Sequence, residues 1–175
     1  KFKRVIIIGM GGSILGSEAV NDFLKYKTKK DIIFVNNIND ETIIKINKIK
    51  NLKNSLFFLI SKSGNTIEVL SIINTLKSKA KFNKKNTLII TENKKNQLSQ
   101  FGREFQIKTI YHRNYISGRY SVFSETALIP CYFMGVNTVK LRKNILNYLF
   151  KEKSTFFNNL VNLTKIYHSK KINSL

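Results

Sequence analysis

Five short apolar runs, separated by stretches with helical spacing, constrain what this chain can fold into more than any other feature. The runs are Arg4–Ile8, Ile32–Val35, Leu56–Ile60, Thr87–Ile90 and Ile107–Ile110. Continuous apolar runs of this length are typical of strands buried on both faces in a parallel sheet. Because strand and helix patterns alternate with short connections, we predict right-handed crossovers that place helices on both faces of the sheet.

Helical spacing fills the gaps between the runs. Residues Thr66–Ala80 repeat apolar side chains at the i, i+3, i+4, i+7 spacing, and Asp40 is the expected N-cap of a shorter helix. Gly16–Leu24 and Asn96–Phe101 fill the remaining gaps. Up to about residue 135 the chain is therefore predicted to be a three-layer α/β/α sandwich around a five-stranded parallel sheet.

Beyond Gly135 the strand pattern stops, and helical spacing continues to the end of the chain. We therefore expect two parts, an α/β domain over residues 1–138 and a helical extension over residues 139–175. No initiator Met or leader precedes the first run, and no stop signal closes the last helix. We expect the chain to be the N-terminal portion of a longer protein, with the extension truncated.

Composition and charge exclude several classes of protein. The formal net charge of +21 suggests a polyanionic partner, but Lys, Asn and Ile make 71 of the 175 residues, which an AT-rich coding sequence would produce without selection for binding. The lysines are scattered and no nucleic-acid-binding motif accompanies them, so we expect no nucleic-acid partner. The apolar runs are too short to cross a membrane. A single cysteine, Cys131, suits a reducing, cytoplasmic location.

The first run leads into a glycine-rich turn, Gly9–Gly16. Such a turn at the start of a helix lets backbone amides approach an anion closely. A dinucleotide site is disfavoured, because Ile14 stands where the third glycine belongs and because Asn36 and Asn37, rather than an acidic residue, follow the second run. Two interpretations of the turn stay open, an anion contact and a turn required for tight packing alone.

The third run ends at a polar segment, Ser61-Lys62-Ser63-Gly64-Asn65-Thr66. Ligands bind at the carboxyl ends of strands in open α/β sheets, and the next helix should point its N-terminus into the same space. Hydroxyl and amide donors with one ammonium suit a phosphate monoester. A helix-capping loop without a ligand is the alternative.

A third polar segment, Ser117–Ser124, follows the fifth run and contains Arg119, one of only five arginines. In a chain dominated by lysine, an arginine at this edge of the sheet suggests that a planar, permanent cation is required there. A structural role for the side chain is equally compatible with the pattern.

Taken together and in this order, the three segments resemble the N-terminal sugar isomerase (SIS) domain of the glucose-6-phosphate isomerase family. The resemblance covers about residues 4–135 and includes the stretch Phe34–Asn39. The Gly118-Arg119-Tyr120-Ser121 segment is its most specific part. The family implies a Rossmann-like, flavodoxin-like domain that takes part in interconverting glucose 6-phosphate and fructose 6-phosphate through an enediolate.

The resemblance also assigns roles to particular residues. The sugar phosphate is expected at the loop Ser61–Thr66, which comprises Ser61, Lys62, Ser63, Gly64, Asn65 and Thr66. Gly12 and Ser13 are expected to touch the sugar, and Arg119 to stabilise the enediolate. The reaction implies a hexose phosphate substrate, no metal and no redox cofactor, and the whole enzyme is expected to be a homodimer.

Some residues depart from the family's pattern. Ser63 replaces a threonine, and Glu125 stands where a small residue is usual. The family's glutamate base, ring-opening histidine and lysine lie past the arginine segment, and His112 and His168 match none of them, so we interpret both histidines as structural. The chain alone is expected to bind without turnover. The alternative is a regulatory SIS domain that senses a phosphosugar.

Overall fold

The computed structural model describes residues 2–28, 30–39, 41–42, 44, 48–49, 52–150 and 153–169. It divides the chain into two compact units, Lys1–Val136 and Asn137–Leu175. The first unit contains the sheet and all three polar segments singled out from the sequence.

Five strands form one sheet in which every neighbouring pair is parallel. They are β1 (Arg4–Gly9), β2 (Asp31–Val35), β3 (Ser55–Ile60), β4 (Thr87–Glu92) and β5 (Lys108–His112). Their spatial order is β2-β1-β3-β4-β5, which is the flavodoxin-like order. The predicted parallel sheet is therefore confirmed.

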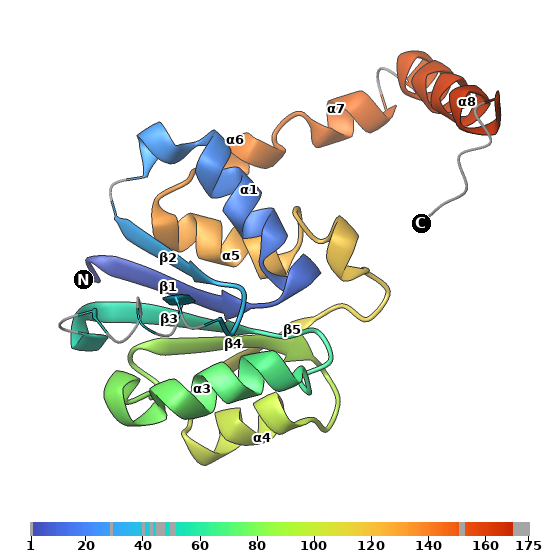
Figure 1. Ribbon diagram of the computed structural model, residues 1–175. Helices are drawn as coiled ribbons and strands as arrows, with labels where there is room; N and C mark the ends of the chain where they lie inside the picture. Colours follow the sequence, from blue (N-terminus) through green and yellow to red (C-terminus); the bar gives the residue numbers. More distant parts are fainter. Residues whose placement is uncertain are drawn as a thin grey trace. The chain divides into compact units, whose positions relative to one another are not determined.

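Helices cover both faces of this sheet, as Figure 1 shows, so the predicted three layers are confirmed. One face carries α1 (Leu15–Phe23) and α5 (Glu125–Met134), and the other carries α3 (Ile67–Ala80) and α4 (Gln97–Glu104). Four short 3-10 turns are η1 (Gly11–Ser13), η2 (Lys25–Lys27), η3 (Leu52–Asn54) and η4 (Gly118–Tyr120). The N-cap expected at Asp40 lies outside the described residues, as does most of the helix expected after it.

The core lies around the two central strands. Every residue of β3 is buried, and Val5–Ile8 of β1 are fully inaccessible to solvent. Against them α3 packs a stripe of buried residues, and Leu70, expected in that stripe, is only half-buried while Ile72 is buried. Burial of this kind stabilises the fold by about 1.5–3 kcal/mol for each large apolar side chain. The buried strands β1 and β3 therefore hold in place the carboxyl-end edge of the sheet, where the polar segments begin.

The second unit is helical, as expected for the stretch beyond Gly135. It contains α6 (Thr138–Arg142), α7 (Ile145–Phe150) and α8 (Lys153–Ser169). The side chain of Asn137 caps α6 by accepting a hydrogen bond from the amide of Lys140 at 2.9 Å. In the part of the chain that the structure describes, no helix combines the length and the apolar character needed to cross a bilayer.

Candidate functional site

The candidate site lies where the chain leaves the carboxyl ends of β1 and β3. These strands are neighbours in the sheet, but β1 continues through η1 into α1 on one face, whereas β3 continues into α3 on the other. Ligands bind in open α/β sheets at such a point, because the two connections diverge and leave space between them. The glycine turn and the Ser61–Thr66 loop therefore share one edge of the sheet.

The arginine segment reaches the same place through a close backbone contact between η1 and η4. A Cβ placed on Gly12 would lie 2.6 Å from Gly118 Cα and nearer still to its carbonyl carbon. The buried Ser121 hydroxyl bridges the two turns, 3.0 Å from the carbonyl oxygen of Gly12 and 2.6 Å from that of Gly118. Tight packing is therefore one reason for glycine at position 12, and Ser13 beside it is half-buried.

Three hydroxyls of the Ser61–Thr66 loop form a hydrogen-bonded cluster. Buried Ser61 lies 2.8 Å from Thr66, oxygen to oxygen, and its Oγ accepts from the amide of Gly64 at 3.1 Å. Ser63 accepts from the amide of Asn65 at 3.2 Å and lies 3.4 Å from the Thr66 hydroxyl. Ser63 and Asn65 are exposed, so the cluster has one side in solvent and one in the protein.

The loop is fixed to α4 by its middle residues. Gly64 has φ +69°, and a Cβ there would lie 2.6 Å from Asn96 Nδ2 and closer to its Cγ, so only glycine fits. The Gly64 carbonyl accepts from the amide of Leu98 at 2.9 Å, and Asn65 Oδ1 accepts from the amide of Gln97 at 3.0 Å. The hydroxyls are thus presented on a rigid turn.

The loop ends at the N-terminus of α3, which has no side-chain cap. Thr66 is the N-cap residue, but its hydroxyl faces Ser61 and Ser63 instead of accepting from the first turn of the helix. The first amides of a helix are left without intrahelical partners and carry the positive end of its dipole. An anion seated here would meet amides and hydroxyls together.

Lys62 points toward the segment that follows β5. Its ammonium donates to the carbonyls of Asn114 at 3.0 Å and Ile116 at 2.9 Å, and it lies 3.6 Å from Glu92 Oε1. A hydrogen bond from Lys94, assisted by the charges of Lys94 and Lys62 and opposed by burial, holds the pKa of Glu92 below its usual value. The ammonium therefore joins the Ser61–Thr66 loop to the backbone that leads from β5 to Arg119.

Arg119 lies in η4 with its side chain exposed. Within the described ranges nothing forms a hydrogen bond or an ion pair with its guanidinium. Its neighbour Tyr120 is also exposed. The guanidinium is thus free to meet a ligand at this edge of the sheet.

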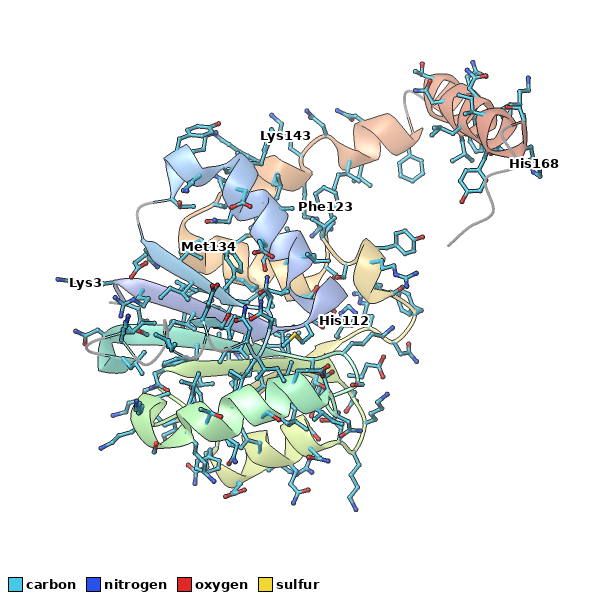
Figure 2. The ribbon with its side chains drawn as sticks, in the orientation of Figure 1. Lys3, His112, Phe123, Met134, Lys143 and His168 are labelled. Carbon is cyan, nitrogen blue, oxygen red and sulfur yellow. The ribbon has the colours of Figure 1, made fainter. Side chains whose placement is uncertain are left out.

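Sequence reasoning missed the residues that tie these segments together. The carbonyls of Asn114 and Ile116 carry no motif, because their partner Lys62 lies far away in the chain. Ser121 belongs to the Gly118–Ser121 motif, but its hydrogen bond to Gly12 was not predicted. His112, labelled in Figure 2, is buried at the end of β5 and lies close to Glu125 at the start of α5. Among the described residues, no three His, Cys, Asp or Glu side chains gather as a metal site would require.

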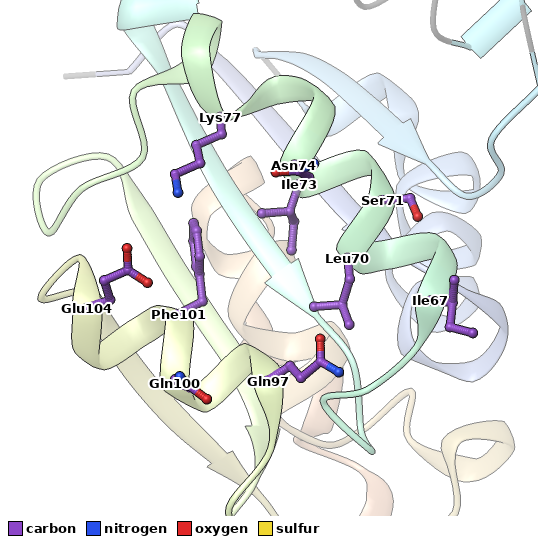
Figure 3. A pocket seen from close by; sticks show the side chains of 10 residues that line it. All are labelled: Ile67, Leu70, Ser71, Ile73, Asn74, Lys77, Gln97, Gln100, Phe101 and Glu104. Carbon is purple, nitrogen blue, oxygen red and sulfur yellow. The ribbon is translucent and has the colours of Figure 1, made fainter.

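A separate open groove of about 600 Å³ runs between α3 and α4 (Figure 3). Leu70, Ile73 and Phe101 form its apolar part, and Lys77 and Glu104 stand at one end. None of the site residues predicted from the sequence lines it. The groove is therefore distinct from the edge of the sheet where the three polar segments meet.

Known proteins resemble this chain over most of its length. The family model of phosphoglucose isomerase matches residues 1–148. The chain is 34% identical over 146 residues to the glucose-6-phosphate isomerase of Campylobacter jejuni, covering 79% of this chain and 36% of that protein. The enzyme of the same name from Methanocaldococcus jannaschii is 32% identical over 145 residues, covering 80% and 35%.

Solved structures show the same fold. A hypothetical protein of Thermus thermophilus superposes with a TM-score of 0.70 at 23% identity, covering 78% of this chain and 34% of that one. A glucose-6-phosphate isomerase of Chlamydia trachomatis gives 0.63 at 23% identity, covering 74% and 26%. The chain spans about a third of the length of the curated relatives it matches. From the family match over residues 1–148 and the identity to these relatives, the chain belongs to the phosphoglucose isomerase family.

Proposed function

We propose that this chain is the phosphosugar-binding part of a glucose-6-phosphate isomerase and that it holds the phosphate of a hexose phosphate at the Ser61–Thr66 loop. The observation that supports this most strongly is the N-terminus of α3, which lacks a side-chain cap and stands beside exposed Ser63. A phosphate monoester carries close to two negative charges at neutral pH, so it gains both from the amides and from the dipole of the helix.

The sugar extends from this phosphate toward the glycine turn and the arginine segment. Gly12 and Ser13 contact the sugar, and Arg119 stabilises the negative charge of the enediolate. A fixed cation aimed at an oxyanion strengthens in the transition state more than in the ground state, so it accelerates the reaction instead of only tightening binding. The exposed guanidinium, with no partner in the described part of the chain, fits this role.

Lys62 contributes in two ways in this proposal. Its backbone belongs to the loop that surrounds the phosphate, and its ammonium adds positive charge while holding the Asn114 and Ile116 carbonyls. The same ammonium therefore links the Ser61–Thr66 loop to the backbone that precedes Arg119.

Turnover requires a base to move the proton between the two sugar carbons. The family's base and ring-opening histidine match no residue of this chain, so we propose that the chain alone binds hexose phosphate without isomerising it. Within the whole enzyme we propose the cytoplasmic reaction of glycolysis and gluconeogenesis, in a homodimer, without a cofactor. The SIS domains of phosphosugar-sensing regulators remain the alternative, and the match to the isomerase family favours the enzyme.

Titration calorimetry of the chain with fructose 6-phosphate tests the proposal. Ser63→Ala removes an exposed hydroxyl without leaving a cavity, and we expect about 10- to 100-fold weaker binding, because a hydrogen bond to a charged group contributes about 1.5–3 kcal/mol. Ser78→Ala, an exposed serine at the other end of α3, is the matched control and should bind like the unchanged chain.

Three results would overturn the proposal. The first is the absence of saturable binding to fructose 6-phosphate by the unchanged chain. The second is equal affinity of the Ser63→Ala and Ser78→Ala variants. The third is preferential binding of duplex DNA with a steep dependence on salt, which would make the charge of the chain, and not its loop, the source of binding.

A further inference from the structure

We propose that His112 and Glu125 are positioning residues that hold the arginine segment in place through the carbonyl of Ile116. His112 is the last residue of β5 and Glu125 is the first residue of α5. The two residues therefore flank the stretch 113–124, which contains Arg119. The role given to Arg119 rests on the proposed function. The clamp, defined as His112, Glu125 and the Ile116 carbonyl, rests on the contacts among these three groups.

The first contact joins His112 to the loop that follows it. Its ring is only 3% exposed, and Nε2 lies 3.1 Å from the carbonyl oxygen of Ile116. Because a carbonyl can only accept, Nε2 carries a proton and donates. The same oxygen accepts from Lys62 Nζ at 2.9 Å. Two donors from two different strand ends therefore fix one carbonyl, which uses both of its lone pairs.

The second contact joins His112 to α5. Nδ1 of the ring is buried without a hydrogen bond, and it lies 3.6 Å from Glu125 Oε2. With Nε2 donating to Ile116, Nδ1 is the ring atom that faces the carboxylate of Glu125. The contact places the end of β5 beside the start of α5.

The clamp adds to the two hydrogen bonds of Lys62, and to the turn hydrogen bond from the amide of Ile116 to the carbonyl of Arg113, in holding residues 113–117. Arg113, Asn114, Tyr115 and Ser117 are exposed, whereas Ile116 is half-buried. On the far side of Arg119 the Ser121 hydroxyl fixes the carbonyls of Gly12 and Gly118. Arg119 thus lies between two parts of the backbone that hydrogen bonds hold in place. Loosening the part at Ile116 would let the guanidinium of Arg119 move, although the guanidinium contacts neither His112 nor Glu125.

Amide hydrogen exchange of residues 113–120, measured in the chain by NMR, tests the clamp. Glu125→Ala removes the carboxylate that faces Nδ1, and His112→Leu removes the donor to Ile116, so we expect exchange about 10-fold faster in both variants. Glu125→Gln and His112→Gln can still donate to Nδ1 and to the carbonyl respectively, and they should keep exchange slow. His168→Leu alters an exposed histidine and is the matched control.

Imidazole nitrogen shifts give a signature that packing alone would not produce. We expect these shifts to show a proton on Nε2 of His112, because the Ile116 carbonyl that faces this nitrogen can only accept. Equal exchange in Glu125→Ala and Glu125→Gln, or a His112 ring protonated on Nδ1 alone, would overturn the clamp.

Ligand binding separates the clamp from the proposed function. If both the clamp and the proposed function hold, Glu125→Ala weakens the binding of fructose 6-phosphate about 3-fold. The variant leaves the binding of inorganic phosphate unchanged, because only the sugar reaches Arg119. If the unchanged chain binds neither ligand, the proposed function fails, while the exchange and nitrogen data still decide the clamp. A Glu125→Ala variant that binds fructose 6-phosphate normally and exchanges slowly would refute it.

Discussion

Replacement of Gly12 by alanine tests the backbone contact between η1 and η4. The added Cβ would lie 2.6 Å from Gly118 Cα, against main-chain atoms that cannot rotate away. Overpacking of this kind costs about 1–3 kcal/mol, and displacement of the turns also strains the hydrogen bond that the Ser121 hydroxyl shares between the two carbonyls, at about 0.5–1.5 kcal/mol. We expect a loss of about 2–4 kcal/mol of unfolding free energy from these two sources together.

Urea denaturation followed by circular dichroism measures this loss. With a slope of about 2 kcal/mol per molar urea, the middle of the usual range, the midpoint for Gly12→Ala should fall by about 1–2 M. Gly118→Ala is the matched control on the opposite side of the same contact. Its Cβ would lie 3.3 Å from Gly12 Cα, which a shift of a few tenths of an ångström relieves. Equal losses in the two variants, or none in Gly12→Ala, would refute the reasoning.

Three further predictions concern single side chains elsewhere in the first unit. Burial raises the pKa of Cys131 to about 12, so a thiol reagent at pH 8 should react slowly with the folded chain and quickly in urea. The pKa of Glu92 is lowered, mainly by its hydrogen bond with Lys94. The stability that the Glu92 carboxylate gives the fold is therefore complete above the usual pKa of 4.5, and it is lost as the pH falls through the lower pKa of the folded chain. Glu92→Gln should therefore lose less stability than the unchanged chain over that acid range in urea titrations. Asn96→Ala removes the cap that accepts from the amide of Ser99 at 2.7 Å, and a thermal melt should show a loss of about 0.5–2 kcal/mol.

The sequence was most informative where strands are buried on both faces. The runs in β1 and β3 were predicted almost to their ends, because a strand without an exposed face contains few polar residues. The edge strand β5 was predicted to end at Ile110 but continues to His112. Tyr111 and His112 pair with Thr91 and Glu92 of β4, and such polar ladder positions leave no apolar signal.

The site was predictable in part for a similar reason. All strands are parallel, so polar segments that follow them had to lie at one edge of the sheet, and the three predicted segments lie there. The direction of the Lys62 ammonium was not predictable, because its carbonyl partners lie more than fifty residues away and any residue type can supply a carbonyl. The same holds for the pair His112 and Glu125, which no spacing rule connects.

The contact between the turns η1 and η4 has a consequence for how such a chain can change over evolutionary time. Six of its eight glycines fall in Gly9–Gly16, at Gly64 and at Gly118, although their codons begin with two guanines and resist a genome rich in adenine and thymine. At Gly12 and Gly118 main-chain atoms approach each other without an intervening side chain. A replacement at position 12 therefore has to move two stretches of backbone, whereas a replacement at an exposed position does not.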